Sequence, residues 1–140
     1  MSHPAQVYAI EIKATPEKVW EAITSPDWTR RYFHDTAVRS DWRKGSRIVY
    51  ELPDGSLATD GEVVDVEWPR RLVTTWQFMY DPEMARETPS RVTWEIEDLG
   101  GACRLTVTHD RLEAAPKTEA VVKGGWSAIL GGLRRELEAA

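Results

Sequence analysis

Apolar and polar residues alternate in one short stretch after another, and this repeated alternation is the strongest constraint on how the chain can fold. In "VYAIEIKA", Tyr8, Ile10 and Ile12 fall on one side, while Glu11 and Lys13 fall on the other. A period of two residues is typical of a β-strand with one buried face and one solvated face. A sheet of such strands needs a cover over its apolar face.

Five further stretches show the same alternation, and each assigns a set of side chains to an inner face. Turn signals separate strands at Asp54-Gly55 and at Gly100-Gly101. A seventh, shorter strand is expected around Val38. The inner-face residues that the pattern predicts are Ile48, Tyr50 and Leu52; Val64, Val66 and Trp68; Leu72, Thr74, Trp76 and Phe78; Val92, Trp94 and Ile96; and Cys103, Leu105, Val107 and His109.

Helical patterns occur between the first and second strands and at the end of the sequence. "TPEKVWEAI" has Thr15 as a candidate N-cap and Pro16 at the first helical position, and "SPDWTRRYF" predicts a second short helix that ends near Phe33. The last helix is expected to start near Pro116 or Lys117. Its apolar stripe consists of Val122, Trp126, Ile129, Leu130, Leu133 and Leu137.

The last helix carries four glycines, although each glycine in a helix interior costs about 1 kcal/mol relative to alanine. Helical geometry puts Gly124 and Gly131 opposite the apolar stripe and Gly125 and Gly132 on one flank. We favour close packing of a neighbouring loop, or a kink at Gly124-Gly125, as the reason. Two functional alternatives stay open: a kink that gates a pocket, or a thin helix back that lets another subunit approach.

Strand runs with helices at the ends predict a single α+β domain over residues 1–140. The expected architecture is a curved antiparallel β-sheet covered by the long C-terminal α-helix, with two short helices between the first and second strands. A curved sheet cannot touch a straight helix along its whole length, so a gap should remain between them. Seven tryptophans among 140 residues offer large rings to line that gap.

The order of these elements resembles the helix-grip fold of the START/Bet v 1-like superfamily (SRPBCC). Within it, the chain resembles the branch homologous to the activator of heat-shock-protein-90 ATPase. The matching stretches, which cover nearly the whole sequence in order, are "TPEKVWEAITSPDWTRRYF", "DWRKGSRIVYEL", "GEVVDVEWPRRLVTTW", "SRVTWEIED" with "CRLTVTHDRL", and "GGWSAILGGLRREL". One departure is that a single proline, Pro69, precedes Arg70-Arg71-Leu72, where the family often has two. The resemblance implies a cavity for hydrophobic or aromatic small molecules between sheet and helix, but no single reaction.

Candidate ligand-binding residues come from the predicted inner faces. Several aromatic rings that face a helix unable to close over them are typical of an apolar pocket, although ordinary core is the simpler interpretation of any one ring. His109 ends an apolar strand face, where it would orient a ligand, shuttle a proton or simply bond to a backbone carbonyl. The predicted ligand-binding residues are Tyr50, Trp76, Phe78, Trp94, His109, Trp126 and Leu130.

Motifs for catalysis and cofactor binding are missing from the sequence, and His109 is the one weak catalytic candidate. There is no HExxH, no Cys/His metal-ligand spacing, no GxSxG and no glycine-rich phosphate loop, so no metal or cofactor is expected. Cys103 is expected to be a small buried apolar residue rather than a nucleophile. His34 and Asp35 are expected to form a solvated pair at the mouth of the cavity.

Charge and composition narrow the class of partner. The net charge of −5 argues against nucleic acid, and no apolar run approaches the ~20 residues that span a bilayer. The stretch "MSHPAQVYAI" lacks the features of a signal peptide, and a single cysteine allows no internal disulfide. A cytoplasmic protein is therefore expected, and a homodimer stays open.

Three functions are consistent with the sequence. The first is binding of a hydrophobic or aromatic small molecule in the internal cavity, in the role of a carrier, a sensor or a sequestration protein. The second is a cyclase- or hydrolase-like enzyme with His109 as general acid or base. The third is a stress-related co-chaperone module.

Overall fold

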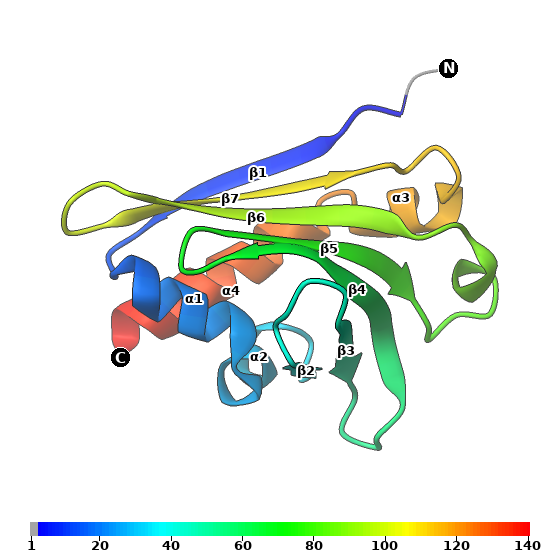
Figure 1. The fold of residues 1–140 in the computed structure, drawn as a ribbon, viewed down its shortest axis with the longest axis horizontal. Helices are drawn as coiled ribbons and strands as arrows, with labels where there is room; N and C mark the ends of the chain where they lie inside the picture. The colour runs from blue at the N-terminus through cyan, green and yellow to red at the C-terminus, as the bar shows by residue number, and fades with distance from the viewer. Residues whose placement is uncertain (1–2) are drawn as a thin grey trace.

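A computed structural model describes residues 3–140, in which a curved, seven-stranded antiparallel sheet packs against the C-terminal helix (Figure 1). The strand order across the sheet is β1-β7-β6-β5-β4-β3-β2. The strands are β1 (Gln6–Ile12), β2 (Ala37–Ser40), β3 (Arg47–Glu51), β4 (Leu57–Glu67), β5 (Arg71–Phe78), β6 (Ser90–Asp98) and β7 (Cys103–Asp110). The helices are α1 (Pro16–Thr24), α2 (Pro26–Tyr32), the 3-10 helix η1 (Met84–Arg86), α3 (Pro116–Val122) and α4 (Gly125–Ala139). The predicted α+β helix-grip fold is confirmed.

The two short helices after β1 form where the sequence predicts them. Thr15 caps α1, because its hydroxyl oxygen accepts a hydrogen bond from the Lys18 N–H at 3.2 Å, and Pro16 stands at the first helical position. The α2 helix ends at Tyr32, one residue before Phe33. Both helices lie on the same side of the sheet as α4 (Figure 1).

The inner face of the sheet is the one that the alternation predicts along most of its strands. Val92, Trp94 and Ile96 of β6 are at most 4% exposed, and Cys103, Leu105, Val107 and His109 of β7 are fully buried. These side chains pack with α1, α2 and α4 into one hydrophobic core. The strongest sequence signal, a period of two, therefore fixes which side of each of these strands faces the helices.

The strand β4 departs from the prediction in its second half. Val64 is 38% exposed and Trp68, which lies beyond the strand end, is 64% exposed, whereas Val63 is fully buried. The cause is a bulge between Val63 and Asp65, which pairs Val63 with Thr74 but Val66 with Leu72. An extra residue in one strand shifts the alternation by one, so the inward positions change from odd to even numbers at this point. The predicted common inner face of Val64, Val66 and Trp68 is therefore wrong for Val64 and Trp68.

The C-terminal helix is shorter than predicted, because α3 and α4 are separate helices. The sequence predicts one helix from Pro116 or Lys117, but the helix α3 ends at Val122 and α4 begins at Gly125. Between them Gly124 has φ +83°, a left-handed backbone conformation that a side chain disfavours. Gly132 has a different role, since a Cβ there would lie 3.2 Å from the Tyr32 Cβ of α2. The chain thus changes direction at Gly124 between two helices rather than by a kink within one, and Gly132 packs closely against the helix α2 rather than against a loop.

Exchange of two glycines for alanine should have opposite effects on stability. We expect Gly124→Ala to lower the free energy of unfolding by about 1–2 kcal/mol, because alanine is strained at positive φ. Gly131 lies inside α4 with open space around its Cβ position, so Gly131→Ala should raise that free energy by about 0.5–1 kcal/mol. Urea unfolding of both variants measures the difference, and equal effects would contradict this account.

The functional alternatives for the glycines, a gate at the cavity or a subunit contact at the thin back of the helix, stay predictions.

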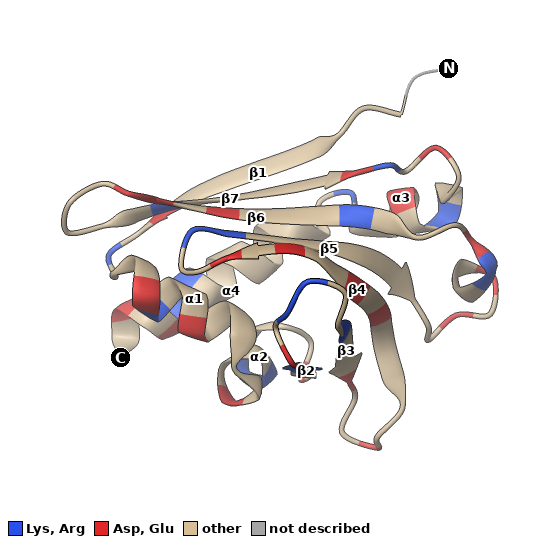
Figure 2. Ribbon diagram, viewed as in Figure 1, with Lys and Arg blue, Asp and Glu red and all other residues tan. Residues whose placement is uncertain are grey.

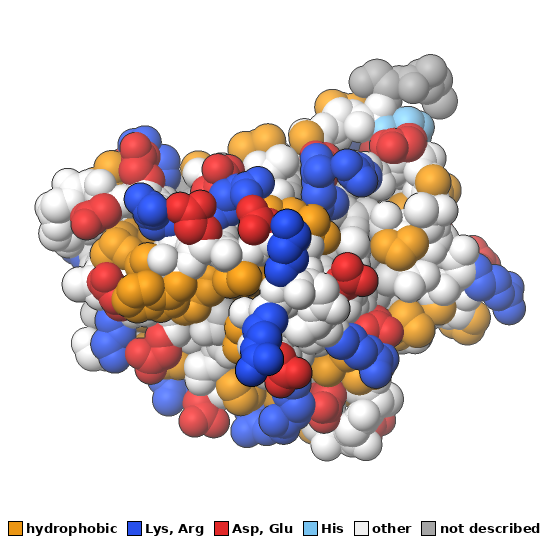
Figure 3. Space-filling view, viewed as in Figure 1, with side chains coloured by type: hydrophobic (Ala, Val, Ile, Leu, Met, Phe, Trp, Pro, Cys, Tyr) orange, Lys and Arg blue, Asp and Glu red, His pale blue; other side chains and the backbone are white. Residues whose placement is uncertain are grey.

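Charged side chains are spread over the loops, the helices and the strands (Figure 2). Several form ion pairs between neighbouring strands, such as Arg47 with Asp60 at 2.9 Å and Arg104 with Glu97 at 3.1 Å. On the face shown in Figure 3, hydrophobic side chains also gather between acidic and basic ones. Within residues 3–140, the structure contains no helix of the length and apolar character needed to cross a membrane.

Candidate functional site

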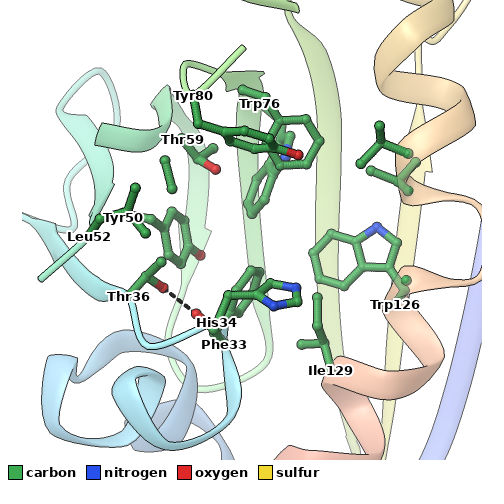
Figure 4. A pocket seen from close by; sticks show the side chains of 15 residues that line it. Phe33, His34, Thr36, Tyr50, Leu52, Thr59, Trp76, Tyr80, Trp126 and Ile129 are labelled. Carbon is green, nitrogen blue, oxygen red and sulfur yellow. Dashed lines mark hydrogen bonds between the residues drawn. The ribbon is translucent and has the colours of Figure 1, made fainter. Parts of the chain in front are cut away.

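A cavity of about 380 Å³ lies between the end of the sheet formed by β3, β4 and β5 and the first turns of α4 (Figure 4). Six of its fifteen lining residues are aromatic, and most of the others are aliphatic. The aromatic members are Phe33, Tyr50, Trp76, Phe78, Tyr80 and Trp126. The others are His34, Thr36, Leu52, Ala58, Thr59, Val121, Val122, Gly125 and Ile129.

The aromatic rings come from three different parts of the fold and contact one another. Phe33 stands directly after α2, Tyr50 and Trp76 belong to β3 and β5, and Trp126 is the second residue of α4. The ring centroids of Phe33 and Tyr50 are 4.9 Å apart, and those of Trp76 and Trp126 are 5.5 Å apart. Such tilted and edge-on pairs hold each ring in place beyond what burial alone does. The cavity therefore has rigid, flat walls.

Three lining residues mark the mouth of the cavity. Tyr80 is 53% exposed, Val121 is 45% exposed, and His34 is also exposed. Tyr80 follows β5, Val121 belongs to α3, and His34 follows α2, so the mouth lies where these three segments meet. Asp35 is not among the lining residues, so only His34 of the predicted pair reaches the cavity.

The cavity wall carries very little charge. Its lining includes no Asp, Glu, Lys or Arg, and its titratable residues are His34 at the mouth and the tyrosines. Burial raises the pKa of the Tyr50 hydroxyl well above its ordinary value, so this group stays protonated. An ion inside the cavity would have to give up its hydration without a fixed counter-charge, which is strongly unfavourable.

Behind Trp126, a chain of buried hydrogen bonds joins α4 to the sheet. The Trp126 indole N–H donates to His109 Nδ1 at 3.1 Å, and His109 Nε2 lies 2.6 Å from the Ser90 hydroxyl oxygen. An indole can only donate, so Nδ1 must accept and the proton of the neutral ring sits on Nε2. Ser90 in turn donates to the carbonyl oxygen of Trp76 at 3.2 Å. This chain of bonds fixes the orientation of the Trp126 ring in the cavity wall.

The environment of His109 keeps its ring neutral. Burial lowers its pKa to about 4, and the nearby carboxylate of Asp110 only partly opposes this effect. The Asp110 carboxylate itself is held by Arg91 through paired hydrogen bonds. His109 is fully buried and is not a lining residue, so a ligand in the cavity has Trp126 between itself and the imidazole.

The family follows from a comparison with known proteins. The profile described as "Activator of Hsp90 ATPase homolog 1-like protein" matches residues 13–138, nearly the whole chain. The chain belongs to this family. The branch inferred from the sequence is thereby confirmed.

Solved structures share the fold of this Activator of Hsp90 ATPase homolog 1-like chain. Protein MLL2253 from Mesorhizobium loti matches with a TM-score of 0.79 at 22% identity, over 98% of each chain. DynU16, described as a protein in the dynemicin biosynthetic locus, matches with a TM-score of 0.78 at 26% identity, over 98% of this chain and 48% of its own. The Aha1 dimer from Colwellia psychrerythraea has a TM-score of 0.73 at 22% identity, over 97% of each chain. No curated protein matches.

The structure brings four of the seven predicted site residues to the cavity of this family member. Tyr50, Trp76, Phe78 and Trp126 line it. Trp94 lies behind Trp126, edge-on, with ring centroids 5.4 Å apart. His109 and Leu130 are likewise buried outside the lining.

Sequence reasoning missed most of the remaining wall. Phe33 and Tyr80 are the two missed aromatic residues, and the only sequence signal of Phe33 was its position at the end of a predicted helix. Ile129 was placed on the apolar stripe of the last helix but not in the site. Thr59 lies in the wall because it pairs with Tyr50 across β3 and β4. That pairing depends on the strand register, which is hard to infer from sequence.

Cys103 behaves as a structural residue. It is fully buried, and its thiol lies 3.2 Å from the Ala14 carbonyl oxygen. Burial raises the pKa of this thiol to about 11, so little of the reactive thiolate forms near neutral pH. Among residues 3–140, no three His, Cys, Asp or Glu side chains are grouped as they would be around a metal ion.

Proposed function

We propose that this protein binds a hydrophobic or aromatic small molecule in the cavity between the sheet and α4, in the role of a carrier, a sensor or a sequestration protein. The observation that carries the proposal is the cavity itself, about 380 Å³ in volume and lined mainly by aromatic and aliphatic side chains. Its volume lies within the range of about 300–1,000 Å³ that small-molecule sites occupy. The six aromatic rings supply flat apolar surface for contact with a flat ligand.

The position of His109 weighs against the enzymatic alternative. A general acid or base must come within hydrogen-bonding distance of the reacting group. Both ring nitrogens of His109 are already engaged by Trp126 and Ser90, and the ring does not line the cavity. Binding without a reaction at His109 is therefore the function that the geometry supports best. The single thiol, which is buried, is compatible with the cytoplasmic location expected from the sequence.

Filling the cavity should abolish binding without unfolding the protein. Ile129 points from α4 into the cavity (Figure 4), so Ile129→Trp places a large ring in the ligand space. We expect this variant to bind tetralin, a flat apolar bicyclic molecule, at least tenfold more weakly than the wild type. Nuclear magnetic resonance of the seven tryptophan indole N–H groups during a tetralin titration measures the affinity.

The matched control adds the same side chain to the neighbouring position on the outer side of the helix. Ala128 is exposed, so Ala128→Trp should leave tetralin binding unchanged. Thermal unfolding of both variants checks that the fold is retained. The proposal fails if the wild-type indole signals do not respond to flat apolar molecules, or if Ile129→Trp binds tetralin as the wild type does.

A further inference from the structure

Two hydroxyl groups in the cavity wall have no hydrogen-bond partner among residues 3–140. Tyr50 is 2% exposed and Thr59 is 3% exposed, and both line the cavity. Two other buried hydroxyls are paired, since Tyr32 donates to the Ala22 carbonyl oxygen at 2.7 Å and Thr36 to the Phe33 carbonyl oxygen at 2.6 Å. The buried hydroxyl of Thr74, by contrast, has no partner within residues 3–140. The hydroxyl oxygens of Tyr50 and Thr59 are not among the fully buried unpaired atoms of the described residues, so they open onto the free space of the cavity, where a ligand can bond to them.

The register of the sheet places the two hydroxyls on the same wall. Tyr50 of β3 and Thr59 of β4 are direct partners across the two strands, and both side chains are on the inner face. Directly opposed residues lie about 5 Å apart on one face of an antiparallel pair. Figure 4 shows both side chains extending from the sheet toward the cavity, with Trp126 and Ile129 of α4 on the opposite side.

The cavity wall also contains a hydrogen-bond donor that no acceptor of the protein satisfies. The indole N–H of Trp76, another lining residue, is buried and has no partner within the described residues. An indole N–H only donates, and the protonated Tyr50 hydroxyl has a proton to donate. Since the lining contains no acidic or basic side chain apart from His34 at the mouth, an ionised acceptor would be poorly stabilised deep in the cavity.

We propose that the ligand is a neutral, flat molecule with a carbonyl oxygen, such as an aromatic ketone, quinone or lactone, which accepts hydrogen bonds from Tyr50 and Thr59. This inference rests on the proposed binding function and specifies its ligand class. The oxygen-bearing edge of the ligand faces β3 and β4, and its apolar face lies against Trp126 and Phe33. The two hydroxyls thus select for an oxygen atom at one place in an otherwise apolar site.

A pair of probes that differ in one group tests this assignment. 1-Tetralone carries a carbonyl where tetralin carries a methylene, and the two molecules are otherwise closely similar in shape. A hydrogen bond to a neutral donor contributes about 1 kcal/mol, so the ratio of tetralone to tetralin affinity should fall about fivefold in Tyr50→Phe and in Thr59→Val. Tetralin itself should bind the variants and the wild type equally, because it has no acceptor.

The matched control is Tyr32→Phe, which removes the hydroxyl of a buried tyrosine outside the cavity lining. It should leave the affinity ratio unchanged. It should also lower the melting temperature, because its hydroxyl is bonded to Ala22, whereas Tyr50→Phe should not. A lower melting temperature for Tyr50→Phe would show that its hydroxyl already has a partner, which would overturn the inference.

The outcomes separate this inference from the function on which it rests. If the wild type binds neither probe, the binding function fails and the ligand class fails with it. If both probes bind and the affinity ratio is the same in wild type, Tyr50→Phe and Thr59→Val, the cavity binds apolar molecules but the hydroxyls do not select an oxygen. A fivefold fall in the ratio, absent from Tyr32→Phe, supports the assignment.

Discussion

Replacement of Gly61 by alanine is expected to destabilise the protein by about 3 kcal/mol or more, a larger effect than at any other glycine of residues 3–140. A Cβ at this position would lie 2.2 Å from the Thr75 carbonyl oxygen and 3.0 Å from its carbonyl carbon. Both are backbone atoms, so no side-chain rotation relieves the overlap. Either β4 or β5 must move, and both strands are paired on both sides.

The same contact shapes the cavity. Gly61 lies between the Asp60–Gln77 pair and the Val63–Thr74 pair, and the Glu62 N–H donates to the Thr75 hydroxyl rather than continuing the regular ladder, at 2.9 Å. The strand β4, which contains Gly61, bends along its length (Figure 1). Thr59 and Phe78, which line the cavity, are partners just beyond this point. Movement of β4 away from β5 would therefore displace cavity wall as well as core.

Urea unfolding of Gly61→Ala and Gly131→Ala measures this effect against a matched control. The control adds the same methyl group to a glycine with open space around it and should be slightly stabilising. A loss of less than about 1 kcal/mol in Gly61→Ala would mean that the two strands separate easily. The close approach of Gly61 to Thr75 would then not be what holds β4 and its cavity residues in position.

The sequence predicts faces of strands better than it predicts their bends. Alternation places Trp76, Trp94 and His109 on the inner face, and each is almost fully buried there. No residue type in the sequence marks the bulge after Val63, which is seen only in the pairing of β4 with β5. The break at Gly124 is easier to anticipate, because a glycine marks it, but sequence alone does not distinguish a kink from two separate helices.

The site is less predictable than the fold, because a cavity depends on position along a strand as well as on its face. Trp94 and His109 share the inner face with Trp76, yet only Trp76 reaches the free space. The difference is that the Trp126 ring covers the middle of the sheet, and this follows from where α4 crosses it. Thr59, by contrast, lines the cavity but was not predicted. The sequence analysis selected large apolar and aromatic residues, and this criterion does not identify a threonine in the cavity wall.

Acid should destabilise the protein through His109 between pH 6.5 and pH 4. The folded state lowers the pKa of this histidine from about 6.5 to about 4, so over this range the unfolded chain binds a proton that the folded chain does not. The stabilising contribution is complete above pH 6.5 and disappears as the pH falls to 4. Its total is about 3 kcal/mol, at 1.36 kcal/mol for each pH unit.

The physical reason is the direction of the buried hydrogen bonds. A protonated imidazole donates from both nitrogens, so it cannot accept from the Trp126 indole, which also only donates. Protonation within the folded state therefore sets two donors against each other and buries a charge. The neighbouring carboxylate of Asp110 acts at lower pH, because Arg91 holds its pKa below the ordinary value. Its stabilising contribution is lost only as the pH falls from that ordinary value toward the lowered pKa.

The variant His109→Asn isolates this effect. An amide oxygen keeps an acceptor for the Trp126 indole but does not titrate, so unfolding free energies of the variant should change about 3 kcal/mol less than those of the wild type between pH 7 and pH 4. Urea unfolding at pH 7, 5.5 and 4 gives both profiles, and the Trp126 indole N–H resonance reports whether the indole loses its partner. Parallel profiles would show that His109 does not carry the dependence. If the variant does not fold, the ring resonances of His109 in the wild type provide the same test, because a titration midpoint near 6.5 would contradict a ring held neutral behind the cavity wall.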